Sequence, residues 1–140
     1  MAAIHIIKNT GTQTVLKVYR ETAGTETISL SSLALPTEEI SGTPLVNIRS
    51  IMFGMKPNSH IVVQRDSGGV AEGEIYLTSA GFFDFAGNGF ADSSYNDKNI
   101  QIVFSSEGTV FIDVAKVKGF KPKLQPAQFS VYDDPSSTTA

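Results

Sequence analysis

The chain consists of short runs rich in β-branched and aromatic residues, and a turn signal interrupts these runs about every 8–12 residues. Within most runs apolar and polar residues alternate, which is the pattern of a strand with one buried face. Helices that would connect parallel strands are not indicated anywhere in this pattern. The spacing therefore predicts an all-β fold, an antiparallel β-sandwich or barrel of about seven to nine short strands.

Composition supports this fold class. Val, Ile, Thr, Phe and Tyr make up 48 of the 140 residues, whereas Leu, which leads in helical proteins, occurs seven times. A length of 140 residues is typical of one domain with a sizeable core. The expected strands cover residues 3–7, 14–20, 27–30, 45–55, 60–66, 70–77, 82–85, 100–104 and 109–117.

Charge and residue types exclude several kinds of site. The net charge is −3 and the isoelectric point is near 5.3, so a basic nucleic-acid groove is not expected. The chain has no Cys, which excludes thiol nucleophiles, disulfides and zinc sites that use Cys. We expect no cofactor, no metal and no nucleic-acid partner.

The first residues, MAAIHIIKNTG, lack the basic leader and apolar block of an export signal. No apolar run approaches the ~20 residues that a membrane-spanning helix needs. The sequence thus predicts a protein made in the cytoplasm without a membrane partner.

Three segments depart from simple alternation. Alternation fails between Ile28 and Leu35, which predicts a bulge or an early strand end. Residues 36–44 hold two Pro, one Gly and two acids, and are expected to form a solvated loop. After Ala115 the apolar phase slips, because Lys116 and Lys118 take the positions that would continue it. The basic stretch of Lys116, Lys118, Lys121 and Lys123 is interpreted as a solvated strand edge, with a phosphate-binding strip as the alternative.

The C-terminal residues 121–140 differ in composition from the rest, with several Pro, Ser, Thr and acidic residues. We divide the chain into a β-domain of residues 1–120 and an extended arm of residues 121–140. The arm contains Phe129, Val131 and Tyr132, which are unusual choices for a segment that stays in water. They are predicted to anchor the arm on a neighbouring subunit; the alternative is a frayed end of the domain.

One tetrapeptide invites an enzymatic interpretation. Residues Asp66, Ser67, Gly68 and Gly69 match the sequence around the nucleophile of chymotrypsin-like proteases. However, neither His lies in the local context of that family, and 140 residues cannot hold its two barrels. A hairpin turn between two alternating strands is favoured, no catalytic residue is predicted, and His60 is interpreted as a strand-start imidazole.

The loop at residues 88–99 is rich in Asp, Asn and Ser, which are oxygen donors suited to Ca²⁺ but without the spacing of a known calcium loop. The same loop carries Phe90 and Tyr95, which would suit stacking on a sugar. A solvated loop, a calcium site and a glycan site stay open here.

Four Phe lie within nine residues, at positions 82, 83, 85 and 90. In a strand, Phe83 and Phe85 face one way and Phe82 faces the other way with Asp84. A covered core explains the cluster, whereas exposure of Phe82 or Phe90 would indicate a second protein-contact surface.

The order of several segments resembles that of small β-rich structural proteins from the virions of tailed phages, marine and cyanobacterial ones in particular. These segments are IRSIMFG at 48–54, HIVV at 60–63, GFFDFAGNG at 81–89, IQIVF at 100–104 and GTV at 108–110. The resemblance covers about residues 45–120. It implies a capsid decoration or cement protein or a component of the neck or tail, and no catalytic residue.

We therefore expect a non-enzymatic virion protein, assembled in the host cytoplasm, that stabilises the phage head by repeated contacts with the major capsid protein or other virion proteins. Formation of a homo-oligomer, with a trimer among the options, fits this role. A module that binds carbohydrate or the host surface is the alternative.

Overall fold

A computed structural model describes residues 3–85 and 95–123, and the elements within them form an all-β fold. Nine strands and one short 3-10 helix follow one another in these ranges. They are β1 (Ile4–Asn9), β2 (Gln13–Arg20), β3 (Gly24–Ile28), η1 (Leu30–Leu33), β4 (Glu38–Met55), β5 (His60–Ser67), β6 (Val70–Thr78), β7 (Ala80–Asp84), β8 (Asn99–Phe104) and β9 (Gly108–Pro122).

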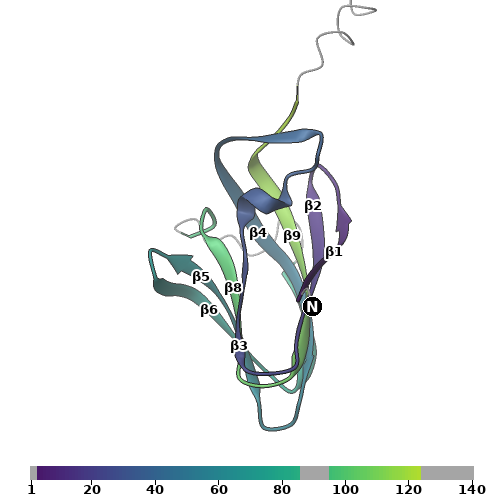
Figure 1. Cartoon of the computed structure of the whole chain (residues 1–140), viewed down its shortest axis with the longest axis vertical. Helices are drawn as coiled ribbons and strands as arrows, with labels where there is room; N and C mark the ends of the chain where they lie inside the picture. Colours follow the sequence, from purple (N-terminus) through teal and green to yellow (C-terminus); the bar gives the residue numbers. More distant parts are fainter. Residues whose placement is uncertain (1–2, 86–94, 124–140) are drawn as a thin grey trace, which may run out of the picture.

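The strands form two antiparallel sheets that pack face to face. One sheet has five strands in the order β1-β2-β9-β4-β7, and the other has four in the order β3-β8-β5-β6. Figure 1 shows the two layers, with β5, β6 and β8 to the left and β1, β2 and β9 to the right. The predicted antiparallel all-β fold is confirmed, and of the two alternatives, sandwich and barrel, the two separate sheets make it a sandwich.

The core lies between the sheets and follows from alternation. In β2, β5, β8 and β9, buried and partly exposed residues alternate along the strand. Each strand thus contributes one apolar face to the core, and every fully buried aliphatic side chain contributes about 1.5–3 kcal/mol. The most deeply buried side chains include Leu16, Val18, Ile51, Ile61, Val63, Ile100, Ile102, Phe104, Val110 and Ile112.

The early end predicted for the third strand is confirmed. β3 begins at Gly24, earlier than expected, and ends at Ile28, and the 3-10 helix η1 follows. Residues three apart lie on the same side of a 3-10 helix, so Leu30 and Leu33 both enter the core. The side-chain amide of Asn9 donates to the carbonyl of Leu33 at 2.9 Å and holds the helix against the first hairpin.

The loop expected at residues 36–44 is wrong from Glu38 onward. The strand β4 begins there and pairs with β9 as far as Pro122, with register shifts between Ile40 and Leu45. The paired ends of β4 and β9 rise toward the top of Figure 1. β9 therefore continues two residues beyond the expected boundary at residue 120, and Lys123 donates its backbone N–H to the carbonyl of Thr37 at 2.8 Å.

The solvated edge expected at Lys116 is also wrong. β9 is the central strand of its sheet, and Lys116 is 8% exposed. Its ammonium donates to the carboxylate of Glu38 at 3.0 Å and lies 5.0 Å from the ring centroid of Phe120. The alternation of buried residues in β9 thus continues through Lys116, whereas Lys118 is exposed. A buried ion pair takes the place of an apolar contact.

Within residues 3–85 and 95–123, no helix has the length and apolar character required to cross a bilayer.

Candidate protein-contact surface

The outward face of the five-stranded sheet carries a row of side chains that crosses all five strands. His5 in β1 is opposite Lys17 in β2, and Lys17 is opposite Phe111 in β9. Phe111 is in turn opposite Met52 in β4, and Met52 is opposite Phe82 in β7. We call these five residues the outer ladder. Their sequence neighbours Leu16, Ile51 and Ile112 are buried in the core, so the ladder residues point away from it.

The apolar part of the outer ladder is exposed. Phe82 is 59% exposed and Met52 is 49% exposed. Phe111, in β9 between β2 and β4, is half-buried. Single exposed apolar residues are common on protein surfaces, but three that are adjacent in one row form a patch that favours a protein contact. The outward orientation predicted for Phe82 is therefore present in the structure.

Two hollows flank the outer ladder. The larger, of about 440 Å³, is lined by Lys17, Met52, Phe53, Gly54, Thr109 and Phe111. The smaller, of about 190 Å³, is lined by Val15, Ser50, Met52, Phe82, Phe111 and Asp113. Met52 and Phe111 line both and form a ridge between them. The larger hollow exists partly because Gly54 has no side chain and a Cβ there would meet nothing within 4 Å.

Charge is distributed unevenly around the ridge. Lys17 lines the larger hollow, whereas Asp113 lines the smaller one. The side-chain amide of Gln13 donates to both carboxylate oxygens of Asp113, at 2.9 and 3.0 Å. Beyond the larger hollow, the hydroxyl of Tyr19 donates to Glu107 at 3.0 Å, and this hydrogen bond raises the pKa of Tyr19 above its usual value.

The inward half of the aromatic cluster belongs to the core side of the sheet. The ring centroids of Phe53 and Phe83 are 5.6 Å apart, and those of Phe83 and Phe85 are 6.4 Å apart. Phe85, which directly follows the edge strand β7, packs against the core. Phe82 and Phe83 thus face opposite ways as predicted, but the covered core expected for the cluster is wrong for both, since Phe82 is 59% and Phe83 is still 42% exposed.

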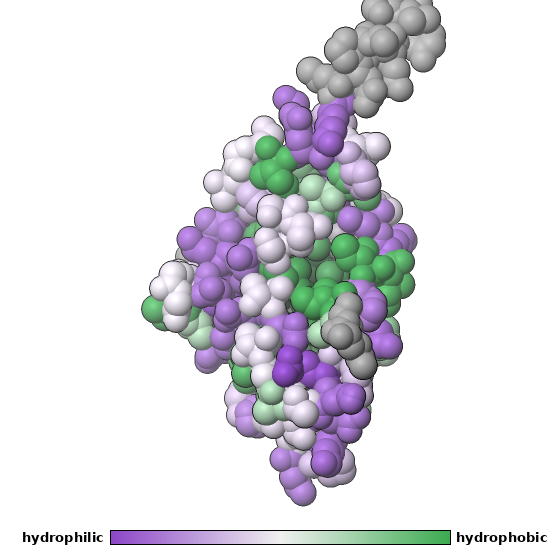
Figure 2. All heavy atoms as spheres, viewed as in Figure 1, coloured by the Kyte–Doolittle hydropathy of each residue, from purple (hydrophilic) through white to green (hydrophobic). Residues whose placement is uncertain are grey.

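A second apolar patch lies at the other edge of this sheet, on β1. Ile6 and Ile7 are 49% and 55% exposed. Figure 2 shows this hydrophobic area at the right of the molecule. β1 is an edge strand, so Ile6 and Ile7 lie beside a sheet edge with which no strand pairs in the described part of the chain.

The Asp-Ser-Gly-Gly segment forms a tight hairpin, as predicted. Gly68 and Gly69 have φ angles of 63° and 90°, as both central residues of a type I′ turn require. The N–H of Gly69 donates to the carboxylate of Asp66 at 2.9 Å. His60 lies seven residues away at the other end of β5, about 23 Å along the strand, so it cannot act as a base for Ser67.

His60 instead stacks on Tyr76 on the outward face of the four-stranded sheet. The ring centroids are 5.0 Å apart and the ring planes differ by 15°. Tyr76 is 62% exposed. Among the residues that the structure describes, no three His, Asp or Glu side chains are grouped as a metal ion would require.

The part of the loop at residues 88–99 that the structure describes forms hydrogen bonds with other segments of the domain. Asn99 accepts a hydrogen bond from the N–H of Leu30 at 3.1 Å, and the amide of Asn96 donates to Asn47 at 3.3 Å. Tyr95 is partly buried. Phe90, the other aromatic residue of the proposed glycan site, lies outside the described residues.

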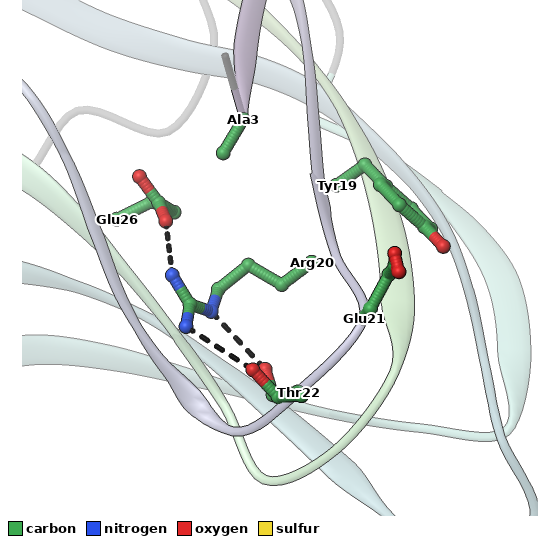
Figure 3. Close-up of a pocket in the computed structure, with 6 residues that line it drawn as sticks. All are labelled: Ala3, Tyr19, Arg20, Glu21, Thr22 and Glu26. Carbon is green, nitrogen blue, oxygen red and sulfur yellow. Dashed lines mark hydrogen bonds and ion pairs between the residues drawn. The ribbon is translucent and has the colours of Figure 1, made fainter. Parts of the chain in front are cut away.

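Sequence reasoning missed a hollow of about 340 Å³ beside the turn between β2 and β3 (Figure 3). The guanidinium of Arg20 crosses it and binds the carboxylate of Glu26. It also donates to the carbonyls of Thr22 and Ala23, both at 3.1 Å. Because these acceptors occupy most of its donors, Arg20 stabilises the turn and is not available to an anionic ligand.

No protein-family model, curated protein or solved structure matches this chain.

Of the contact residues predicted from sequence, the structure describes Phe82 alone. Phe90 and the arm residues Phe129, Val131 and Tyr132 lie outside the described residues. Met52 and Phe111 were missed as contact residues because their strands are rich in apolar residues, which is typical of strands buried in a core. Their outward alternation with Ile51 and Ile112 was the available signal.

Proposed function

We propose that this protein is a non-enzymatic structural protein of a virion, a decoration or cement protein that binds the capsid through the outer ladder. The observation that carries this proposal is the outward apolar row on the five-stranded sheet, in which Phe111 is half-buried and Met52 and Phe82 are exposed. A partly apolar sheet face with open hollows and no cluster of titratable side chains among their lining residues suits contact with another protein surface better than chemistry on a small substrate.

The energetics fit a protein that acts in many copies. Burying side chains that are already half-covered contributes about 1 kcal/mol each, below the ~1.5–3 kcal/mol of a fully exposed apolar side chain. Three such residues give a weak pairwise contact. On a symmetric shell, neighbours already held in place raise the effective concentration, so weak contacts add up to stable attachment. A neck or tail component would use the same face in the same way.

Particle incorporation tests this proposal. Tagged full-length protein is expressed in the cells that natively carry the gene, and particles are purified on a density gradient. We expect the wild-type chain at a fixed copy number per particle and a loss of ten-fold or more for Met52→Asp. Tyr76→Asp, a change at a similarly exposed position on the opposite sheet, is the matched control and should be incorporated normally.

Two results would contradict the proposal. Absence of the wild-type chain from particles would exclude the virion role. Normal incorporation of a folded Met52→Asp variant, with its fold checked by circular dichroism, would exclude the outer ladder as the contact.

Carbohydrate binding is a second candidate, supported by the exposed Tyr76 stacked on His60. An exposed aromatic face of this kind can stack on a sugar ring. A glycan array would show binding that Tyr76→Ala abolishes and Met52→Asp does not. A silent array with folded wild-type protein would remove this candidate.

A further inference from the structure

We infer that the outer ladder receives residues 128–132 from a second copy of this chain. The inference rests on the proposed function, because it names the partner of the same surface. Three features of the molecule support it: the place where β9 ends, the spacing of the two hollows, and the charges around them.

The position of the chain after β9 requires the donor to be a different copy. β9 ends at Pro122, eleven residues and about 36 Å along the strand from Phe111. Phe129 lies seven residues beyond Pro122, so a fully extended chain carries it at most about 25 Å. Reversing direction at the end of β9 would use part of that length. Phe129 therefore cannot reach the outer ladder of its own subunit.

The hollows have the spacing of alternate residues in a strand. Ser50, Met52 and Gly54 follow one another at intervals of two in β4, and the hollows lie on either side of Met52. Their centres are therefore about 7 Å apart, the distance between residues i and i+2 of an extended segment. Phe129 and Val131 are such a pair, separated by Ser130. An extended segment running along the strands can insert one side chain into each hollow.

The position of Lys17 favours one direction for this segment. The acidic pair Asp133 and Asp134 follows directly after Tyr132. Lys17 lines the larger hollow and Asp113 lines the smaller one. Placing Val131 in the larger hollow brings the acids toward Lys17, and placing Phe129 in the smaller one keeps them away from Asp113. The opposite direction would place the acids beside Asp113, in a hollow whose lining includes no lysine, whereas Glu107 beyond the larger hollow already accepts the hydroxyl of Tyr19.

Cross-linking between differently tagged full-length chains tests the inference. One chain carries Ser130→Cys and the other carries Ser50→Cys, and both keep the apolar anchors. Because the natural chain has no Cys, a short bis-maleimide can join only these positions. The matched control is Thr27→Cys, an exposed position on the outward face of the other sheet. We expect at least five-fold more mixed dimer with Ser50→Cys than with Thr27→Cys.

Adding Met52→Asp to the Ser50→Cys chain should reduce the mixed dimer to the control level. Equal yields at the two positions, or a yield unchanged by Met52→Asp, would overturn the inference. It is also overturned if a chain that ends at Lys123 still enters particles while Met52→Asp does not, since the occupant is then another shell protein. That last result leaves the proposed function standing. If the mixed dimer forms but the chain is absent from particles, the inference stands and the proposed function is excluded.

Discussion

The ammonium nitrogen of Lys116 lies 3.0 Å from the carboxylate oxygen Oε1 of Glu38, and the two side chains are 1% and 6% exposed. The same oxygen accepts a hydrogen bond from the N–H of Leu35 at 2.9 Å. This contact joins the first residue of β4 to the central strand β9 across 78 positions of sequence. The pair thereby anchors the start of β4 to the sandwich.

Removing one partner of this pair should destabilise the protein strongly. Lys116→Met leaves a buried carboxylate without its counter-charge, which typically costs about 3–5 kcal/mol. Urea unfolding followed by circular dichroism measures the loss. The exposed Lys118→Met is the control, with an expected change within about 0.5 kcal/mol.

The double variant Glu38→Leu, Lys116→Met should recover much of that loss, because apolar residues of similar volume often replace a buried ion pair at little cost. A single variant as stable as the wild type would contradict this account of the pair.

Acid should weaken the same contact. Burial alone would raise the pKa of Glu38, but the hydrogen bonds from Leu35 and Lys116 and the charge of Lys116 outweigh it, so the pKa lies below its usual 4.5. The unfolded chain therefore binds the proton more readily than the folded one. The stabilisation is complete above about pH 4.5 and is lost as the pH falls through the lowered pKa.

The difference in unfolding free energy between wild type and Glu38→Gln isolates this group from the other carboxylates. We expect the difference to be constant from pH 7 to pH 5 and to shrink below pH 4.5. A difference that stays constant down to pH 3 would contradict the assignment.

The regular strands were predictable because their own residues carry the signal. In β5, Ile61 and Val63 alternate with partly exposed neighbours, and β8 repeats the pattern with Ile100 and Ile102. The start of β4 carried no such signal. Its pairing depends on Glu38 meeting Lys116, and local sequence cannot express a contact between residues so far apart.

The contact surface was predictable only in part, because it too depends on contacts between residues that are far apart in the sequence. The alternation in β7 indicated that Phe82 and Phe83 face opposite ways. Its neighbours Met52 and Phe111 depend on the register among β4, β7 and β9, where a slip of one residue would turn each side chain to the other face.

Gly119 allows β9 to pass close to β4, and replacing it should destabilise this paired end. Its φ is +91°, and a Cβ there would lie 2.6 Å from the Cα of Pro44. Gly119→Ala therefore combines backbone strain of about 1–3 kcal/mol with a clash against backbone. Thermal unfolding should show a lower Tm. Gly54→Ala is the control, since its Cβ meets nothing within 4 Å and its φ is not positive, and equal Tm values for the two variants would contradict this interpretation.

Arg65 bridges the two sheets, and its loss should loosen the sandwich at that end. The side chain is 5% exposed, and its guanidinium donates to the carbonyl of Val46 at 2.6 Å and to that of Lys98 at 2.8 Å. Arg65→Met keeps most of the apolar stem but leaves both acceptors without this donor, at a cost of about 1–3 kcal/mol each. Urea unfolding measures the total loss of stability.

Hydrogen exchange shows where the sandwich loosens. Because Val46 belongs to β4 and Lys98 directly precedes β8, exchange should accelerate there before it does so in the first hairpin, β1 and β2. Uniform acceleration across all strands would mean that Arg65 contributes to global stability alone and does not hold this end of the sandwich.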